Sequence, residues 1–338
     1  MKKKWQHIRH VHSLSGYMRV LSGIQPSGEP HLGNYFSMMR RMIEYQQSHE
    51  LFCFIASYHS LTTISSGKEL SENILNVAMD FLALGMDPAR SVFWVQSDVP
   101  EVMELTWLLS TQITVPQMEL AHSYKDKVAQ GIPPSGGLFF YPILMAADIL
   151  LFGAQRVPVG KDQKQHLEMT REICRRFNNQ YGEILVMPEP DILEDVATVP
   201  GVDGRKMSKS YGNAIYPFAP EKKLRKTIMS IQTDSTPVEA PKDPENSVLF
   251  DIFALFLDAD GRRQLAERFR TPGEGYGHIK QSLFETILEY FKEPRERRAE
   301  LLKHPDDVRD ILRDGARRAR EVARPYLEKA RQATGMVY

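Results

Sequence analysis

Two short stretches, far apart in the chain, carry residues that suit phosphate chemistry. The first, Gly204 to Asn213, places the ammonium groups of Lys206 and Lys209 three residues apart, with small residues at both ends. Two cations on a mobile segment could clamp a polyphosphate, because negative charge accumulates on phosphate oxygens when a phosphate bond breaks. By itself, such a lysine pair more commonly marks a solvated basic loop, so the second stretch decides its interpretation.

The second stretch, Ser22 to Asn34, has the complementary chemistry. A buried strand is expected over residues 18–22, and helical spacing over residues 35–45 predicts a helix that opens at the preceding turn. A strand, a glycine-bearing turn and a helix point backbone N–H groups at an anion. From this turn His31 could donate to a phosphate oxygen, and Gly33, which has no side chain, would let a ligand approach the backbone closely.

Composition limits the class of protein. The 338 residues are 42% hydrophobic and 25% charged, which is ordinary for a globular chain with one large domain and a smaller one. The 43 basic and 43 acidic residues balance, so contact with nucleic acid must come from local patches. Cys53 and Cys174 are too few for a disulfide framework and suit a reducing cytosol. The longest apolar run, residues 136–152, is shorter than the roughly 20 residues that a bilayer needs, so no membrane segment is expected.

Strand and helix patterns alternate in the first part of the chain. Further strands are expected at 51–56, 91–96 and 157–159, and helices at 70–82, 100–110, 138–152 (after Pro142) and 163–181. This alternation predicts an α/β fold with a doubly wound parallel sheet. Beyond the lysine stretch only helices are expected, at 221–230, 249–257, 278–291, 295–303 and 308–330. Arginines on the last helix indicate either a solvated face or an RNA contact.

Together, the two stretches resemble the paired signatures of class I aminoacyl-tRNA synthetases. His31-Leu32-Gly33-Asn34 is similar to the His-Ile-Gly-His motif of this class. Residues 206–210 are identical to its second motif, Lys-Met-Ser-Lys-Ser. The runs 141–151, 157–166 and 175–178 narrow the resemblance to tryptophanyl-tRNA synthetases. It covers essentially the whole sheet domain in order, and in the helical part it is only general.

The resemblance implies a ligase that activates L-tryptophan with ATP, releasing pyrophosphate, and then transfers tryptophan from the adenylate to tRNA(Trp). It implies a Rossmann-like (HUP) catalytic domain of residues 1–205, with an extension over 1–17, completed by a C-terminal helix over 306–338. A smaller all-helical domain over 206–305 would bind the anticodon. The family also implies Mg²⁺ accompanying ATP with no metal held by the protein, a homodimer, a cytoplasmic location and no membrane association.

The family's functional residues can be carried over where the motifs match. The catalytic set is Lys206, Ser208, Lys209, His31 and Lys127. The ATP-binding set is Gln25, Ser27, His31, Gly33, Asn34, Gly160, Asp162, Lys206, Met207, Ser208 and Lys209. The tryptophan-binding set is Asp148, as acceptor of the indole N–H, with Met145, Tyr141, Gln163, His59 and Gln25.

Some positions depart from the family pattern, and other functions stay open. His31 stands where many members have threonine, Lys161 where an acid is frequent, and Ser123 where several relatives have glutamine. An aspartate in an apolar pocket could hold a phenol as well as an indole, so a tyrosyl-tRNA synthetase relative is one alternative. The others are an amino-acid adenylyltransferase that never meets tRNA and a non-catalytic tRNA-binding paralogue, which the intact lysine motif disfavours.

Overall fold

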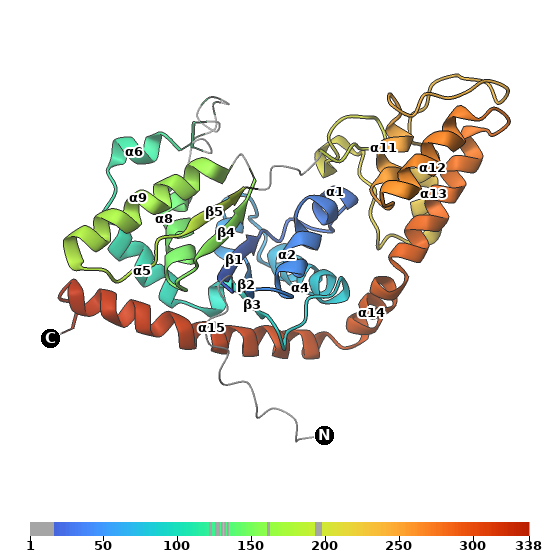
Figure 1. The fold of residues 1–338 in the computed structure, drawn as a ribbon. Coiled ribbons are helices and arrows are strands. Elements are labelled where there is room, and N and C mark those ends of the chain that lie inside the picture. The colour runs from blue at the N-terminus through green and yellow to red at the C-terminus, as the bar shows by residue number, and fades with distance from the viewer. Residues whose placement is uncertain are drawn as a thin grey trace.

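The centre of the molecule is a five-stranded sheet in which every pairing is parallel and the strand order is β3-β2-β1-β4-β5 (Figure 1). This computed structural model describes residues 17–121, 124–125, 129, 131, 133, 135–160, 163–192 and 198–337. The strands are β1 (Arg19–Ile24), β2 (Glu50–Ile55), β3 (Val92–Val95), β4 (Arg156–Val159) and β5 (Glu189–Ile192). The strand order reverses between β1 and β4, which opens a crevice at their carboxyl ends. The predicted doubly wound α/β fold is confirmed.

Both faces of the sheet are buried, because alternate residues of β2 enter different cores. Leu51, Cys53 and Ile55 join one cluster, and Phe52 and Phe54 join the other. The first cluster is covered by α1 (Leu32–Asn34), a π-helical turn (Tyr35–Met39), α2 (Arg40–Tyr45) and α4 (Gly67–Ala83). The second lies under α5 (Glu101–Ser110), α8 (Gly136–Leu150) and α9 (Lys164–Tyr181) (Figure 1). The short helices α3 (Ser57–Ser60) and α6 (Val115–Glu119) add Tyr58 and Met118 to it.

Beyond residue 206 the regular structure of the described chain is helical. Its helices are α10 (Glu221–Met229), α11 (Val248–Ala254), α12 (Ala259–Arg270), α13 (Tyr276–Tyr290), α14 (Lys292–Lys303) and α15 (Pro305–Ala333). Figure 1 shows α11, α12 and α13 standing away from the sheet, while α15 runs back beneath it. At Gly315 the α15 backbone lies so close to β3 that a Cβ atom would fall 1.8 Å from the carbonyl oxygen of Phe93. Only glycine permits this approach.

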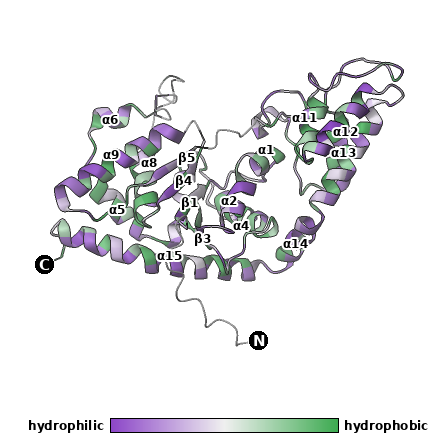
Figure 2. Cartoon of the chain, in the orientation of Figure 1, coloured by the Kyte–Doolittle hydropathy of each residue, from purple (hydrophilic) through white to green (hydrophobic). Residues whose placement is uncertain are grey.

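The exposed face of α15 is charged but paired. Purple and green residues alternate along α15 in Figure 2, as expected for a helix with one buried face. Its arginines form ion pairs within the helix or with α5: Arg309–Asp306, Arg313–Asp310, Arg317–Asp314, Arg320–Glu101 and Arg331–Glu104. Of the two interpretations of this face, the pairing favours a solvated surface that also anchors α15 on α5.

Several sequence expectations were wrong in detail. Strand β5 was not predicted because Pro190 lies within it, yet β5 pairs only with β4, and an edge strand tolerates proline. Helix α12 was also not predicted, although Asp258 caps its first turn by accepting from the backbone N–H of Gly261, 2.8 Å away. Helix α8 begins at Gly136 and continues through Pro142, since burial of its apolar face outweighs the lost backbone bond. No helix in the described ranges is long and apolar enough to cross a bilayer.

Candidate active site

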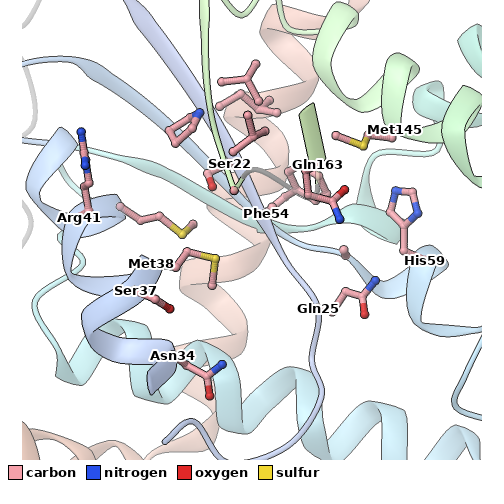
Figure 3. A pocket seen from close by; sticks show the side chains of 18 of the residues that line it. Ser22, Gln25, Asn34, Ser37, Met38, Arg41, Phe54, His59, Met145 and Gln163 are labelled. Carbon is pink, nitrogen blue, oxygen red and sulfur yellow. The ribbon is translucent and has the colours of Figure 1, made fainter. Parts of the chain in front are cut away.

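A cavity of about 820 Å³ lies at the carboxyl ends of β1 and β4 and reaches the lysine motif. Figure 3 shows some of the side chains that line it, among them Gln25, Asn34, His59, Met145 and Gln163. It is lined by twelve of the predicted site residues: Gln25, His31, Gly33, Asn34, His59, Tyr141, Met145, Asp148, Gly160, Gln163, Lys206 and Met207. Ser27, Ser208 and Lys209 do not line it. The predicted Lys127 and Asp162 lie outside the described residues, as do Ser123, Lys161 and residues 1–16 of the expected extension.

The turn at His31 forms a reciprocal cap on the first helix. The backbone N–H of Asn34 donates to Nδ1 of His31 at 3.3 Å, and the backbone N–H of His31 donates to Oδ1 of Asn34 at 3.1 Å. Burial lowers the pKa of His31, which favours the neutral ring. Because Nδ1 accepts a hydrogen bond, the proton of the neutral ring is on Nε2, which remains a donor.

The two motifs meet at this turn, although more than 170 residues separate them. The backbone N–H of Gly33 donates to Sδ of Met207 at 3.3 Å. Gly28 has a φ of +101°, and a Cβ atom there would lie 2.9 Å from Nζ of Lys209. The structure therefore brings Lys209 over the loop that precedes His31, even though its side chain does not line the cavity.

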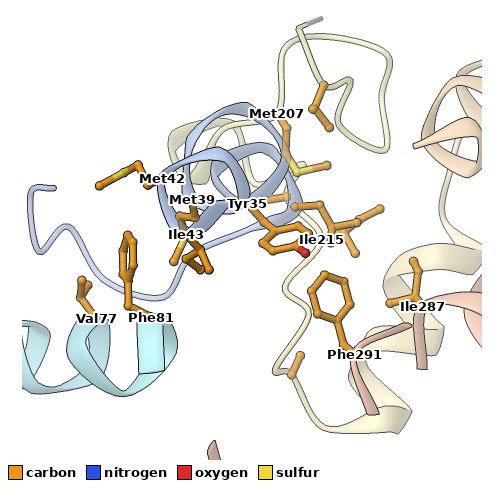
Figure 4. Packing of buried hydrophobic residues seen from close by; sticks show 14 of the residues in the cluster. Tyr35, Met39, Met42, Ile43, Val77, Phe81, Met207, Ile215, Ile287 and Phe291 are labelled. Carbon is orange, nitrogen blue, oxygen red and sulfur yellow. The ribbon is translucent and has the colours of Figure 1, made fainter. Parts of the chain in front are cut away.

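The lysine loop combines exposed cations with buried anchors. Lys206 and Lys209 are exposed, whereas Met207 is 3% exposed and packs beside Tyr35 and Ile215 (Figure 4). Asn213, 2% exposed, ties the loop together by accepting from the backbone N–H of Ser208 at 2.8 Å and donating to the carbonyl of Lys206 at 3.2 Å. Asn213 therefore anchors the end of the loop that carries both lysines.

Asp148 lies at the opposite end of the cavity and is 2% exposed. Its Oδ2 atom is 2.7 Å from Nε2 of His59, and Nε2 of Gln96 donates to both carboxylate oxygens at 2.8 Å. Burial raises the pKa of Asp148, and the bonds from His59 and Gln96 oppose this rise. Beside it, the Tyr141 hydroxyl donates to Oε1 of Gln163 at 3.2 Å, and the rings of Tyr141 and His59 meet edge to face.

The structure adds residues that the sequence did not single out. Gln96 follows β3, and its position at the carboxyl end of a buried strand was the available signal. Figure 3 shows Ser37, Met38 and Arg41 on the cavity side of the first helical stretch. A regular helical spacing from Tyr35 predicted the helix but did not reveal which of its polar residues line a cavity. Within the described ranges, no group of three or more His, Cys, Asp or Glu side chains could hold a metal ion.

Comparisons with known proteins identify the family. The family described as tRNA synthetases class I (W and Y) matches residues 14–292. A tryptophan–tRNA ligase of Fusobacterium nucleatum is 52% identical over 320 residues, which are 94% of this chain and 98% of that protein. The crystal structure of the Campylobacter jejuni tryptophanyl-tRNA synthetase with ADP and tryptophan has a TM-score of 0.90 at 52% identity, covering 94% of this chain and 100% of that chain.

A solved structure of lower sequence identity shares only the fold with this chain. The tyrosyl-tRNA synthetase of Archaeoglobus fulgidus with L-tyrosine has a TM-score of 0.61 at 21% identity over 83% of this chain and 90% of that chain, so it shows the shared fold alone. The relatives at 52% identity confirm the predicted resemblance and the predicted tryptophan–tRNA ligase function. This chain belongs to the class I tRNA synthetase family of tryptophan and tyrosine.

Proposed function

We propose that tryptophan activation and its transfer to tRNA(Trp) take place in the 820 Å³ cavity, with the amino acid at Asp148 and ATP between His31 and the lysine loop. The observation that carries this proposal is the continuity of the cavity, which joins Asp148, the His31 turn and Lys206. With the tryptophan side chain held at one end of the cavity and the phosphates of ATP at the other, the substrate carboxylate could attack the α-phosphate in line.

At the ATP end, the required chemistry is charge stabilisation. No protein nucleophile is needed, because the substrate carboxylate attacks and pyrophosphate leaves. Nε2 of His31 donates to a phosphate oxygen, while Lys206 and Lys209 hold the departing pyrophosphate with the Ser208 hydroxyl beside them. Gly33 and Met207 offer a surface without bulky polar groups for the adenine ring, with Gln25, Ser27, Asn34 and Gly160 around the nucleotide.

At the amino-acid end, Asp148 accepts the indole N–H beside Met145. Phenylalanine has no such donor, so its binding would leave a buried acceptor unpaired at a cost of about 1–3 kcal/mol. Tyr141 and Gln163 surround the α-ammonium and carboxylate groups, as the motifs imply. His59 lines the same pocket, and Gln25 lies beside it.

The remaining roles rest on the family motifs. Asp162 accepts the ribose hydroxyls and Lys127 contacts the phosphates. Mg²⁺ arrives with ATP, because the triphosphate requires charge neutralisation. Residues 1–205 with 306–338 form the catalytic domain, and residues 206–305 bind the anticodon of tRNA. Free Cys53 and Cys174, both buried, suit a cytoplasmic location.

We also propose a homodimer that forms through an apolar surface on α3, α5 and α8. Trp107 is 69% exposed and Met103 is 45% exposed on α5. Nearby, a cavity of about 500 Å³ is lined by Met103, Leu61 and Phe140, together with His59 and Tyr141 from the active site. Large exposed apolar side chains that gather at one place mark an interaction surface. A second copy of the chain would cover it and support the wall of the tryptophan pocket.

The dimer is tested by the mass of the protein in solution. Trp107→Glu should shift the protein from dimer to monomer in light scattering, whereas Leu302→Glu, at a 51% exposed leucine on α14, should leave the mass unchanged. A wild-type monomer, or a Trp107→Glu dimer, would contradict the proposed interface.

ATP–pyrophosphate exchange with each amino acid in turn tests the central proposal. Tryptophan should stimulate exchange, and tRNA(Trp) should become charged. Stimulation by tyrosine alone would favour the tyrosyl alternative. Exchange without charging would favour an adenylyltransferase that does not use tRNA.

A further inference from the structure

Gln96 is a buried polar side chain at the amino-acid end of the cavity and has no role in the motifs. It begins the 3-10 turn Gln96–Asp98 after β3 and is 2% exposed. Its Nε2 atom donates to both oxygens of Asp148, 2.8 Å from each. The amide therefore straddles the carboxylate that is assigned to the indole.

The orientation of this amide is fixed from the other side. The backbone N–H of Tyr58 donates to Oε1 of Gln96 at 2.9 Å, so Oε1 is the acceptor and Nε2 must face Asp148. A second bond, from the backbone N–H of Ser97 to Oγ of Ser57 at 3.0 Å, links the same two segments. Since His59 follows Tyr58, both groups that contact Asp148 are held in one frame.

The geometry points to Gln96 as a positioning residue for selectivity: it fixes the Asp148 carboxylate so that one oxygen site remains directed to an N–H donor on the substrate side chain. A carboxylate has about four acceptor sites, and three nitrogen–oxygen contacts, from His59 and Gln96, already engage it. One site is left for the ligand. This inference rests on the proposed function, because it requires tryptophan to lie at Asp148.

The chemistry of an amide suits this role. A guanidinium or ammonium group at position 96 would neutralise Asp148 and compete with the substrate for it. An amide contributes a donor without a charge, so it does not neutralise Asp148, whose ionised form can accept a charge-assisted hydrogen bond from the substrate. A glutamate at position 96 would keep the acceptor for Tyr58 but lose the donor and place a second carboxylate against the first.

The experiment compares Gln96→Glu and the uncharged Gln96→Met with a matched control. Gln46 is also buried, donates to the carbonyl of Gly85 at 2.8 Å and accepts from the backbone N–H of Asp87, in a part of the molecule away from Asp148. Gln46→Glu and Gln46→Met therefore report what a buried glutamine contributes to folding alone. ATP–pyrophosphate exchange is measured with tryptophan and with phenylalanine for each variant, over a range of pH.

Both Gln96 variants should lower kcat/KM for tryptophan on the order of 10- to 100-fold, mostly through KM, because a hydrogen bond to a charged group is lost. For phenylalanine, kcat/KM should change less than about threefold, because phenylalanine has no N–H for the carboxylate to accept. The tryptophan KM should also begin to rise at a higher pH than in the wild type, since Asp148 loses a donor to its ionised form. In an Asp148→Asn background, Gln96→Met should have little further effect on selectivity.

The outcomes separate this inference from the function on which it rests. Equal losses for both amino acids, matching the Gln46 variants, would show that Gln96 is only structural. An unchanged tryptophan-to-phenylalanine ratio in both Gln96 variants would also overturn its role. If the wild-type chain shows no tryptophan-dependent exchange, the proposed function fails instead.

Discussion

The two ends of the cavity differ in how they hold charge. Asp148 is 2% exposed and is surrounded by side chains that bond to it within the core. Lys206 and Lys209 are exposed, and only their neighbours Met207 and Asn213 are buried. One end is a fixed acceptor in a desolvated pocket, and the other is a pair of long cationic side chains on an anchored loop.

This difference matches two chemical tasks. Discrimination between amino acids requires an acceptor that is already in place, because a misplaced or hydrated carboxylate would not penalise a ligand without an N–H. Stabilising a departing pyrophosphate requires cations that interact most strongly when its charge develops. Substitutions at Asp148 should therefore alter the selectivity between amino acids, whereas substitutions in the lysine loop should alter the rate of activation.

The largest expected effect is on the rate of activation. Lys209→Ala should lower the single-turnover rate of adenylate formation on the order of 10²- to 10³-fold, because one cationic group that stabilises the negative charge of the transition state is lost. Tryptophan affinity, measured by equilibrium titration, should change less than about twofold, since Nζ of Lys209 lies over Gly28 and not at Asp148.

Lys222→Ala is the matched control, because Lys222 is an exposed lysine on α10. It should leave the activation rate unchanged. An unaltered rate in Lys209→Ala, or an equal loss in both variants, would remove the distinction between the loop and an ordinary basic surface.

At the other end, Asp148→Asn should act on selectivity. The ratio of kcat/KM for tryptophan to that for phenylalanine should fall roughly 10- to 100-fold, because the charged acceptor becomes neutral. Asp80→Asn is the control, since Asp80 is also fully buried but pairs with Arg298 at 2.5 Å, where α4 meets α14. That variant should lower stability without altering the ratio, and a preserved ratio in Asp148→Asn would refute the indole assignment.

A smaller effect is expected where the loop is anchored. Asn213→Ala removes the bonds to the Ser208 N–H and the Lys206 carbonyl, so it should slow activation about tenfold and lower the free energy of unfolding by about 1–3 kcal/mol. Asn178→Ala is the control, because Asn178 makes comparable buried bonds to the backbone of Leu185 in another part of the molecule. Both variants should be less stable in urea titrations, but only Asn213→Ala should activate tryptophan more slowly. Equal activation rates in the two variants would show that Asn213 does not position the lysines.

The sequence predicted those features of the fold and the site that are encoded locally in the chain. The lysine and His31 motifs were recognisable because their residue types and local spacing carry the chemistry, whereas Asp148 was assigned through the resemblance of residues 141–151 to the family. The parallel sheet was predictable because strand and helix periods alternate. Gln96 could not be found in this way, since its partners Tyr58 and Asp148 are distant in the chain and its role exists only after folding.

Local patterns also misled at two places. The prolines around position 190 kept a strand from being predicted there, yet Pro190 occupies an edge strand that pairs with β4. Pro142 suggested a helix start, yet it lies inside α8. In both cases tertiary packing outweighed a local preference, and the residues concerned lie close to the cavity wall formed by β4 and α8.

The smallest expected effect distinguishes the two ends by pH. Burial raises the pKa of Asp148, so its protonation begins at a higher pH than for an ordinary aspartate. Tryptophan requires the ionised form, so proton and tryptophan compete: KM for tryptophan should be constant above this pKa and rise as the pH falls through it. A rise of about two- to fivefold is expected at the acid end of the range in which the chain stays folded. The asparagine side chain in Asp148→Asn does not titrate, so the tryptophan KM of this variant should not follow the same pH curve. Parallel pH profiles of the two proteins would assign the titration to another group.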